Sequence, residues 1–358
     1  MALAPLLAGR ALWLGISAAV VLTEFAEMGL IAGLHTHLVH WDALSYLAIA
    51  RQGYPATLDY HDAFLPGFPL LIRSATFVLR DDVIASWIVN LVAEGVALFY
   101  VVRLVAAERD RGAATFSAWL LALFPTAVFL IAPFTEAPFI AAAAASLFYA
   151  RQGRSGAAAV SAAFAVLFRL TGVALLPALL VEHLARNGRR RARALLWLLL
   201  IPLPLVGYCA YMQLRTGDAL ALFDANGLPS FGHAVAAPWD GLATTWNTMS
   251  TTIDGETRSI FAREIAFGLL GLVASVAMWA SPRIPRSFAL YCTLAWLLTA
   301  SLSFWRSQPR YVLALFPALL LAADATVRSR ATRAVVLTAS AALMCAGTWI
   351  YMQGRWLG

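Results

Sequence analysis

Lysine is absent from this sequence, and charge of either sign is scarce. Charged residues make up 13% of the 358 residues, and all 26 basic residues are arginine. A typical soluble protein carries about a quarter charged residues, because it must cover a large surface with polar groups. The composition therefore excludes an ordinary soluble globular protein.

Motifs of several enzyme classes are also missing. The chain has no Walker loop, no GxGxxG after a strand and no HExxH, which argues against a P-loop nucleotide site, a Rossmann domain and a zinc protease. The three cysteines, Cys209, Cys292 and Cys345, lie in apolar segments without metal-ligand spacing. They therefore indicate neither a zinc site nor a disulfide framework.

Apolar residues are in excess, at 61% with a mean hydropathy of +0.75. The apolar runs reach about 17 to 22 residues, enough to cross a hydrocarbon core of about 30 Å as helix. The stretch from Ala11 to Leu34 contains Glu24 and Glu27 and has no clean cleavage site, so we interpret it as a retained span rather than a signal peptide. We predict spans near 12–33, 83–103, 112–131, 134–150, 156–168, 172–185, 194–214, 263–280, 287–304, 311–327 and 334–351.

The chain is thus predicted to be an all-α polytopic membrane protein, with residues 1–358 in a single membrane domain of about eleven spans. Arginines cluster in the short connections, at 103–111, 151–154, 186–193, 283–286 and 328–333. Under the positive-inside rule these connections face the cytoplasm, together with the N-terminus and Arg10. The net charge of +7 is then a matter of membrane orientation, and no nucleic-acid partner is expected.

Residues 155–185 lie between two arginine clusters, so they must cross the membrane an even number of times if both clusters face the cytoplasm. A helical hairpin broken around Arg169, Leu170 and Thr171 satisfies this condition. Its arms would each be only about 20 Å long, so they would need shielding by protein. One long tilted helix, with ten spans in all, is the alternative.

Two long segments, 34–82 and 215–262, are then extracytoplasmic. With Glu136 and Glu264, this predicted outer face holds 12 of the 19 acidic residues. We expect both segments to form an extracytoplasmic active-site face, with a helix in the first.

The first outer loop reads HWDALSYLAIARQGYP from His40 to Pro55. Asp42 opens a short predicted helix, and Tyr46, four residues later, lies on the same helix face. A carboxylate at the aqueous rim of the membrane could abstract a proton from an acceptor hydroxyl. It could equally cap the helix, because aspartate is a preferred N-cap residue.

Two further segments carry proline within apolar sequence. FLPGFPLLI, from Phe64 to Ile72, either lines a lipid-binding groove at membrane depth or is a junction between loop and helix. PTAVFLIAPFTEAPF, from Pro125 to Phe139, crosses to the predicted outer face. There Glu136 would orient a sugar hydroxyl or cap the following helix.

Arg169 stands well inside an apolar run. A charge within the membrane is expensive and is therefore a functional candidate, and a guanidinium is well suited to a phosphate. A structural ion pair with Glu24, Glu27 or Glu94 is the alternative.

Arg306 and Arg310, in SFWRSQPRYVLALFP, are predicted at the outer boundary, against the positive-inside bias. An anionic ligand or a lipid phosphate would explain them, although Arg306 could also reach lipid headgroups by snorkelling. No cofactor is firmly predicted. The outer histidines with Asp42, Asp59 and Asp62 leave a divalent metal open, but their spacing fits no metal template.

Five segments, in this order, resemble the PIG-V-type mannosyltransferases, which add a mannose during glycosylphosphatidylinositol anchor assembly. They are WDALSYLAIARQGY (41–54), FLPGFP (64–69), PTAVFLIAPFTE (125–136), FRLTG (168–172) and RYVLALFP (310–317). The second departs from the family's usual FFPLxP, because Leu65 and Gly67 intervene. The resemblance implies a GT-C-type fold with a catalytic carboxylate in the first outer loop.

The resemblance also implies inverting transfer of a sugar, most often mannose, from a polyprenyl-phosphate donor to an acceptor hydroxyl. Asp42 would then be the general base. Arg169, Arg310 and Arg306 are expected to hold the donor phosphate. The residues expected to bind substrate are Trp41, Tyr46, Glu136, His40 and Asp62.

An alanine-rich chain whose basic residues are all arginine indicates a GC-rich bacterium. We therefore expect a bacterial plasma membrane protein whose acceptor is a lipid, a glycan or a protein. The alternative is a transporter or lipid flippase, in which broken spans and intramembrane charges are also common. A transporter site should lie at the midplane, whereas a transferase should concentrate carboxylates at the outer rim.

Overall fold

The computed structural model describes residues 1–187, 192–326 and 329–358. Within these ranges the regular structure is helical, apart from one isolated antiparallel bridge between Val235 and Leu302. This confirms the all-α prediction. Most of the predicted arginine cluster at 186–193, together with Arg328, lies outside the described residues.

The helices are distributed evenly along the chain. The first half contains α1 (Leu3–Glu24), η1 (Ala26–Met28), α2 (Leu30–His37), α3 (Asp42–Gln52), η2 (Tyr60–Ala63), α4 (Gly67–Leu79), α5 (Asp82–Glu108), α6 (Arg111–Ala122), η3 (Ala127–Leu130), α7 (Glu136–Arg151), α8 (Ser155–Phe168), η4 (Leu170–Ala174) and α9 (Leu175–Asn187). The second half contains α10 (Ala192–Leu195), η5 (Leu196–Leu200), α11 (Leu203–Thr216), α12 (Ala221–Gly227), α13 (Pro238–Thr251), α14 (Gly255–Ala280), α15 (Arg286–Ala300), α16 (Gln308–Tyr311), η6 (Val312–Ala318), α17 (Leu319–Thr326) and α18 (Arg330–Met352).

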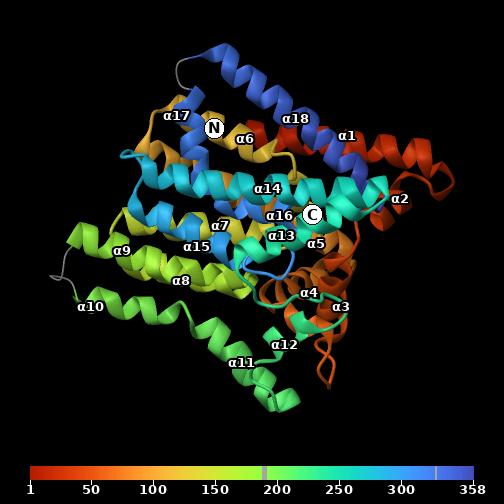
Figure 1. The fold of residues 1–358 in the computed structure, drawn as a ribbon, viewed down its shortest axis with the longest axis horizontal. Helices are drawn as coiled ribbons and strands as arrows, with labels where there is room; N and C mark the ends of the chain where they lie inside the picture. The colour runs from red at the N-terminus through yellow and green to blue at the C-terminus, as the bar shows by residue number, and fades with distance from the viewer. Residues whose placement is uncertain (188–191, 327–328) are drawn as a thin grey trace.

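Several of these helices are long and apolar enough to cross a bilayer, and they lie side by side (Figure 1). Within the described residues there are six such segments: Leu3–Glu24, Asp82–Glu108, Leu196–Thr216, Gly255–Ala280, Gln308–Thr326 and Arg330–Met352. Residues 38–66 and 217–254, with α3 and α12, gather at one end of the bundle, called here the loop end (Figure 1). The architecture is that of a polytopic helical membrane protein.

The first apolar stretch forms two helices rather than one. α1 begins at Leu3 and ends at Glu24, and the chain turns at Gly29, which has a φ of +73°, before α2. The prediction of one span over 12–33 is therefore wrong at both ends. Glu24 accepts hydrogen bonds of 3.0 Å from the Gln353 amide, a partner from the far end of the chain that local sequence does not reveal.

Arg10 lies inside α1 and not in a connection. Its Nη2 is 2.6 Å from Glu94 Oε2, near the middle of α5, and both side chains are largely buried. The same nitrogen donates to the Leu130 carbonyl at 3.2 Å. Arg10 is therefore a buried structural cation within the first span and not a residue that flanks it. Its place on the cytoplasmic side stays a prediction.

The third predicted span is wrong in its last turns, because α6 stops at Ala122, ahead of Pro125. Proline lacks an N–H and its ring obstructs a continuing helix. The chain then runs irregularly, almost wholly buried, until α7 begins. Irregular backbone at this depth needs partners within the protein, and the Asn90 amide supplies one by donating to the carbonyls of Ala132 at 2.5 Å and Phe134 at 3.2 Å.

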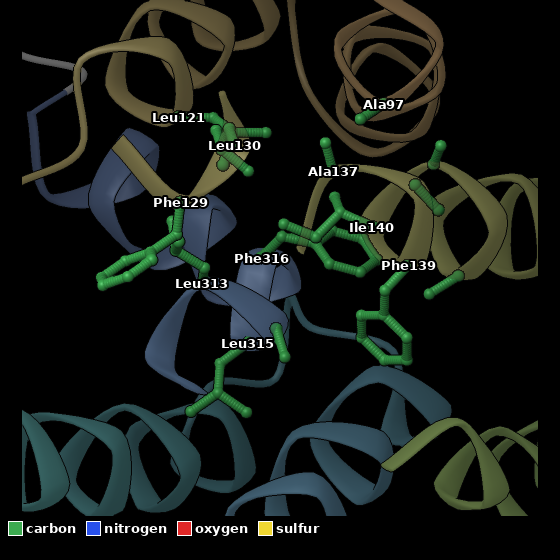
Figure 2. Packing of buried hydrophobic residues seen from close by; sticks show 14 of the residues in the cluster. Ala97, Leu121, Phe129, Leu130, Ala137, Phe139, Ile140, Leu313, Leu315 and Phe316 are labelled. Carbon is green, nitrogen blue, oxygen red and sulfur yellow. The ribbon is translucent and has the colours of Figure 1, made fainter. Parts of the chain in front are cut away.

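A second broken segment, η6, packs beside this one in the centre of the bundle (Figure 2). It contains Pro317 and a non-helical backbone at Leu315, so the predicted span over 311–327 is not one regular helix. The buried side chains from η3, α7 and η6 that gather there are Phe129, Leu130, Ala137, Phe139, Ile140, Leu313 and Phe316. The first irregular segment leads directly into α7, and the second directly follows α16.

Residues 155–185 are broken where the sequence predicts. α8 ends at Phe168, Arg169 is extended with φ −149° and ψ 139°, and η4 then leads back into α9. A Cβ at Gly172 would lie 2.5 Å from the Val166 nitrogen, so only glycine allows η4 to fold this closely against α8. The hairpin is therefore confirmed and the single long helix is wrong.

The FLPGFP segment is a junction between loop and helix. Phe64 and Leu65 are buried in the loop, and α4 begins at Gly67. A Cβ at Gly67 would lie 2.6 Å from the Leu167 carbonyl oxygen. The segment therefore anchors the first loop against the end of α8, next to Arg169.

We expect Gly172→Ala to lower the melting temperature of the detergent-purified protein, because the added Cβ overlaps backbone atoms of α8 that cannot move aside. Gly207→Ala is the matched control. Gly207 lies within α11 with nothing within 4 Å of an added Cβ, and alanine favours a helix by roughly 0.5–1 kcal/mol. Equal melting temperatures for the two variants would contradict the close packing at the hairpin.

Candidate active site

Asp42 is the first residue of α3, and the turn before it is strained. Trp41 has φ 50° and ψ −118°, a conformation that costs a non-glycine residue roughly 1–3 kcal/mol. Packing holds it there, with the ring centroids of Tyr351 and Trp356 at 5.4 and 5.0 Å from that of Trp41. Trp41 is the N-cap residue, so the interpretation of Asp42 as a helix cap is wrong, and its carboxylate is available for another partner.

That partner is Arg310, whose Nη1 lies 2.6 Å from Asp42 Oδ2. Arg310 belongs to the short helix α16, which begins after Ser307 in the left-handed conformation, with a φ of 67°. Glu264 Oε2 accepts the backbone N–H of Gln308 at 2.7 Å and so fixes the first turn of α16. The ion pair thus joins the first loop to an element far along the chain.

Glu136, the first residue of α7, lies between two arginines. Arg169 Nη1 makes a short contact with Glu136 Oε1 and donates to Thr135 Oγ1 at 3.2 Å. Arg310 Nε is 3.6 Å from the same Glu136 oxygen. The partner of Arg169 is therefore none of the three glutamates considered from the sequence. Thr135 is the N-cap of α7 and makes no capping bond, so the capping interpretation of Glu136 is also wrong.

Asp42, Glu136, Arg169 and Arg310 form what we call the four-charge cluster. Their side chains are between 3% and 15% exposed. Glu136 Oε2 and Arg310 Nε are buried without a hydrogen-bond partner, and a guanidinium carries five N–H donors in all. The cluster therefore retains one acceptor and one donor that no protein group satisfies.

Tyr46 lies one turn of α3 beyond Asp42 and is buried. Its ring packs edge-on against Phe64 and Phe68, with centroids at 5.0 and 5.4 Å, and its hydroxyl is in hydrogen-bond contact with that of Thr135. Burial raises the pKa of Tyr46, and the Asp42 carboxylate acts in the same direction. The phenol therefore stays protonated and serves only as a hydrogen-bonding group.

His40 and Arg306 lie beside the four-charge cluster rather than in it. The His40 ring centroid is 5.3 Å from that of Tyr351, and burial lowers the pKa of His40, so the ring is neutral. The Arg306 guanidinium lies 4.5 Å above the Trp356 ring. No carboxylate lies within 4 Å of Arg306 in the described ranges, so its charge is available to a ligand.

Asp62 is not brought to the cluster. It is fully buried in η2 and forms an ion pair with Arg215 at the end of α11. Its backbone carbonyl also accepts the Tyr208 hydroxyl at 2.9 Å. Asp62 thus fastens the first loop to α11.

The histidines and carboxylates of the predicted outer loops do not gather at one point, and several of them form separate pairs. His61 pairs with Asp59, and His35 pairs with Asp81 at 3.2 Å. Among the residues that the structure describes, no three His, Cys, Asp or Glu side chains gather as metal ligands. No metal is therefore assigned to the cluster.

His233, in the second loop, reaches the site although the sequence did not single it out. Residues 234–236 pair with 301–303 through backbone hydrogen bonds, and the His233 ring stacks on Phe304 at 4.7 Å. Burial, then the positive charge of Arg306, lowers the pKa of His233 to about 4. Its only signal in the sequence is a lone histidine in a long polar loop, which does not reveal its neighbours.

Trp356 is a second residue that sequence reasoning missed. Its Nε1 donates to Glu264 Oε1 at 3.1 Å, and its carbonyl accepts Arg263 Nη2 at 2.8 Å. One glutamate therefore orders both the first turn of α16 and the indole that packs on Trp41. An aromatic residue beyond the last predicted span was the only available hint.

The fold and the site define a polytopic helical membrane protein with a buried four-charge cluster at its loop end. No family model matches the chain. The chain is 32% identical over 156 residues to GPI alpha-1,6-mannosyltransferase 2 of Homo sapiens, a match that covers 40% of this chain and 31% of that protein. The Mus musculus protein of the same name is 31% identical over 162 residues, covering 42% and 32%. These matches confirm the resemblance to PIG-V-type mannosyltransferases, and they span about a third of the relatives' length.

Solved structures of an oligosaccharyltransferase from Archaeoglobus fulgidus are also similar in outline. Its apo form has a TM-score of 0.44 at 12% identity, covering 97% of this chain and 56% of that chain. Its complex with an inhibitory peptide and a dolichol-phosphate has a TM-score of 0.41 at 12% identity, covering 99% and 56%.

We expect Glu136→Gln to destabilise the protein, because it leaves two buried guanidiniums without their shared carboxylate. Breaking a buried ion pair by removing one partner costs about 3–5 kcal/mol. Glu256→Gln is the matched control, since the Glu256–Arg355 pair is 2.7 Å long but half exposed. Denaturation in detergent measures both, and a Glu136→Gln effect no larger than that of the control would refute the buried bridge.

We expect His233→Gln to make the protein less sensitive to acid. The pKa of His233 is about 4 in the folded protein and about 6.5 in an unfolded chain. The unfolded state therefore binds the extra proton first, and stability is lost as pH falls from about 6.5 towards about 4. Melting temperatures between pH 7.5 and 4.5 test this, and parallel curves for the two proteins would rule out the effect.

Proposed function

We propose that this protein is a membrane glycosyltransferase of the GT-C type that transfers a sugar from a polyprenyl-phosphate donor to an acceptor hydroxyl. The observation that carries the proposal is the Asp42–Arg310 pair, which places a carboxylate and a guanidinium 2.6 Å apart at the loop end. Glycosyl transfer from a phosphate needs a base for the acceptor and a cation for the leaving group. The partial similarity to mannosyltransferases makes mannose the proposed sugar.

In the proposed reaction Asp42 accepts the proton of the acceptor hydroxyl. The acceptor oxygen forms a bond to the anomeric carbon from the face opposite the phosphate, and the bond between that carbon and the phosphate oxygen breaks. The electron pair leaves with the lipid phosphate, so the anomeric centre is inverted. Arg169 and Arg310 stabilise the charge that develops on the phosphate, where charge-assisted donors in a buried site are most effective.

The remaining predicted residues take supporting roles. Glu136, whose Oε2 has no hydrogen-bond partner, and Tyr46 position sugar hydroxyls. Arg306 adds a third cation for the phosphate, while Trp41 and His40 form the wall beside the base. Asp62 acts through the loop that it fastens, because its own side chain is buried.

We further propose that the chain crosses the bilayer eleven times, with the helix bounds that the structure gives and with the N-terminus in the cytoplasm. The connections α5–α6, α7–α8 and α14–α15, which carry arginines of the predicted clusters, lie at the end opposite the loop end (Figure 1). The positive-inside rule then puts these arginines in the cytoplasm and the four-charge cluster on the extracytoplasmic side. In a bacterium this is the outer face of the plasma membrane.

The transporter alternative requires charges that line a passage at the midplane. The charged pair near the middle of α5 is Arg10 with Glu94, and its side chains are only 14% and 3% exposed. The guanidinium also donates to the Leu130 carbonyl. These contacts favour a structural pair that ties α1 to α5, and they offer no support for a transport path.

We expect Asp42→Asn to abolish sugar transfer while donor binding is largely retained, because the amide cannot accept the proton but the arginines remain. The assay uses purified protein, a polyprenyl-phosphate mannose donor and a mixture of lipid, glycan and peptide acceptors. Asp240→Asn is the matched control, because Asp240 is exposed in the second loop. Full activity of Asp42→Asn would remove it as the base, and solute movement in liposomes without any transfer by wild type would favour a transporter.

A further inference from the structure

A hollow with excess positive charge lies on the side of the loop end, away from the four-charge cluster. It measures about 410 Å³ and is lined by Ala50, Arg51, Arg73, Thr76, Phe77, Arg80 and Asp82, which come from α3, α4 and the start of α5. These three helices pack on one another (Figure 1). Ligand sites typically enclose about 300–1,000 Å³, so the hollow has the size of a binding site.

The charges of the hollow do not balance. Arg51 is paired with Asp82, its Nη2 donating to Oδ1 at 3.0 Å. Arg73 and Arg80 are exposed, and no carboxylate lies within 4 Å of either in the described part of the chain. Among the lining residues three guanidiniums therefore face one carboxylate. The neighbouring Asp81 also acts on Arg51, but it is paired with His35. Arg73 and Arg80 thus carry the positive charge that is left for an anion.

Arg80 has an unusual backbone conformation at the end of α4. It follows the last turn of α4 in the left-handed conformation, with a φ of 59°, where glycine is usually preferred because it has no Cβ. Its guanidinium lies 5.5 Å from the Phe77 ring centroid, which directs it back along the helix. Arg73, Phe77 and Arg80 then follow one face of α4 at spacings of four and three residues.

The hollow lies where a bilayer surface is expected. Asp82 begins α5, one of the six segments long and apolar enough to span a membrane. On α4, Leu70, Phe77 and Val78 are 54%, 76% and 75% exposed. Apolar side chains this exposed suit contact with lipid chains, and arginines beside them can reach the headgroup level.

We propose that this hollow is a binding site for the phosphate head of an anionic bilayer lipid, whose acyl chains lie on the exposed apolar face of α4. Guanidinium donors match phosphate oxygens in geometry and charge. Arg51 is nine residues beyond Asp42 on α3, about 13 Å along the helix axis. The site is therefore separate from the cluster proposed to hold the donor phosphate, and it does not depend on the proposed transfer reaction.

The test is a titration of the full-length protein, in neutral detergent, with phosphatidylglycerol, with bound lipid counted by native mass spectrometry. We expect wild type to bind one phosphatidylglycerol more tightly than phosphatidylcholine. Each neutralising substitution, Arg73→Gln or Arg80→Gly, should weaken that binding about fivefold, the usual effect of one basic residue near an anionic lipid. Arg73→Lys should retain most of it.

Control measurements show whether a loss of lipid binding is specific to the hollow. Arg80→Gly suits the left-handed backbone, so weaker lipid binding at an unchanged melting temperature cannot be attributed to misfolding. Arg258→Ala removes another exposed arginine near the start of α14 and should leave binding unchanged. Equal lipid binding by wild type and the Arg73→Gln/Arg80→Gly double variant overturns the proposal. Displacement of the lipid by millimolar glycerol 3-phosphate overturns the lipid assignment, because the hollow would then bind soluble phosphates.

Discussion

The arrangement of this protein at its loop end depends on one shared carboxylate. Glu136 contacts Arg169 directly and lies 3.6 Å from Arg310, and Arg310 in turn holds Asp42 at 2.6 Å. Two guanidiniums this close would repel each other strongly in a buried setting without a negative charge between them. Four elements distant in sequence, α3, α7, the end of α8 and α16, are therefore fixed relative to one another by electrostatics as well as by packing.

Irregular backbone inside the bundle makes this arrangement possible. A regular helix across the segment after Ala122 would move Glu136 away, and a regular helix through Arg169 would carry its guanidinium past the cluster. Pro125 obstructs a continuation of α6, and hydrogen bonds from Asn90 and Arg10 satisfy carbonyls that would otherwise be unpaired. Close approach at Gly67 and Gly172 lets the broken ends pack tightly. Buried polar groups thus stabilise the irregular turns on which the site residues stand.

Sequence reasoning located the elements of this site better than it located their contacts. The break at Arg169, the short helix from Asp42 and the arginine at 310 follow from signals in the sequence. These are an even number of crossings between two arginine clusters, a polar residue ahead of a helical pattern, and an arginine at the predicted outer boundary against the positive-inside bias. The partner of Arg169 was not foreseen, because ion pairing between residues 33 positions apart leaves no local pattern. The caps expected of Asp42 and Glu136 are absent for a related reason, since a stronger tertiary partner competes with the weak local hydrogen bond.

The sequence by itself determined the class of environment and the candidate chemistry, because hydropathy and charge are properties of single residues and short windows. Long apolar runs require a bilayer. A carboxylate and arginines among such runs are energetically costly, so they indicate a functional role or an ion pair. Only the tertiary structure decided which charges meet, that Arg10 is paired inside the bundle, that Asp62 fastens a loop, and that His233 and Trp356 reach the site. These are distances between residues far apart along the chain, and they exist only once the irregular segments have folded into the core.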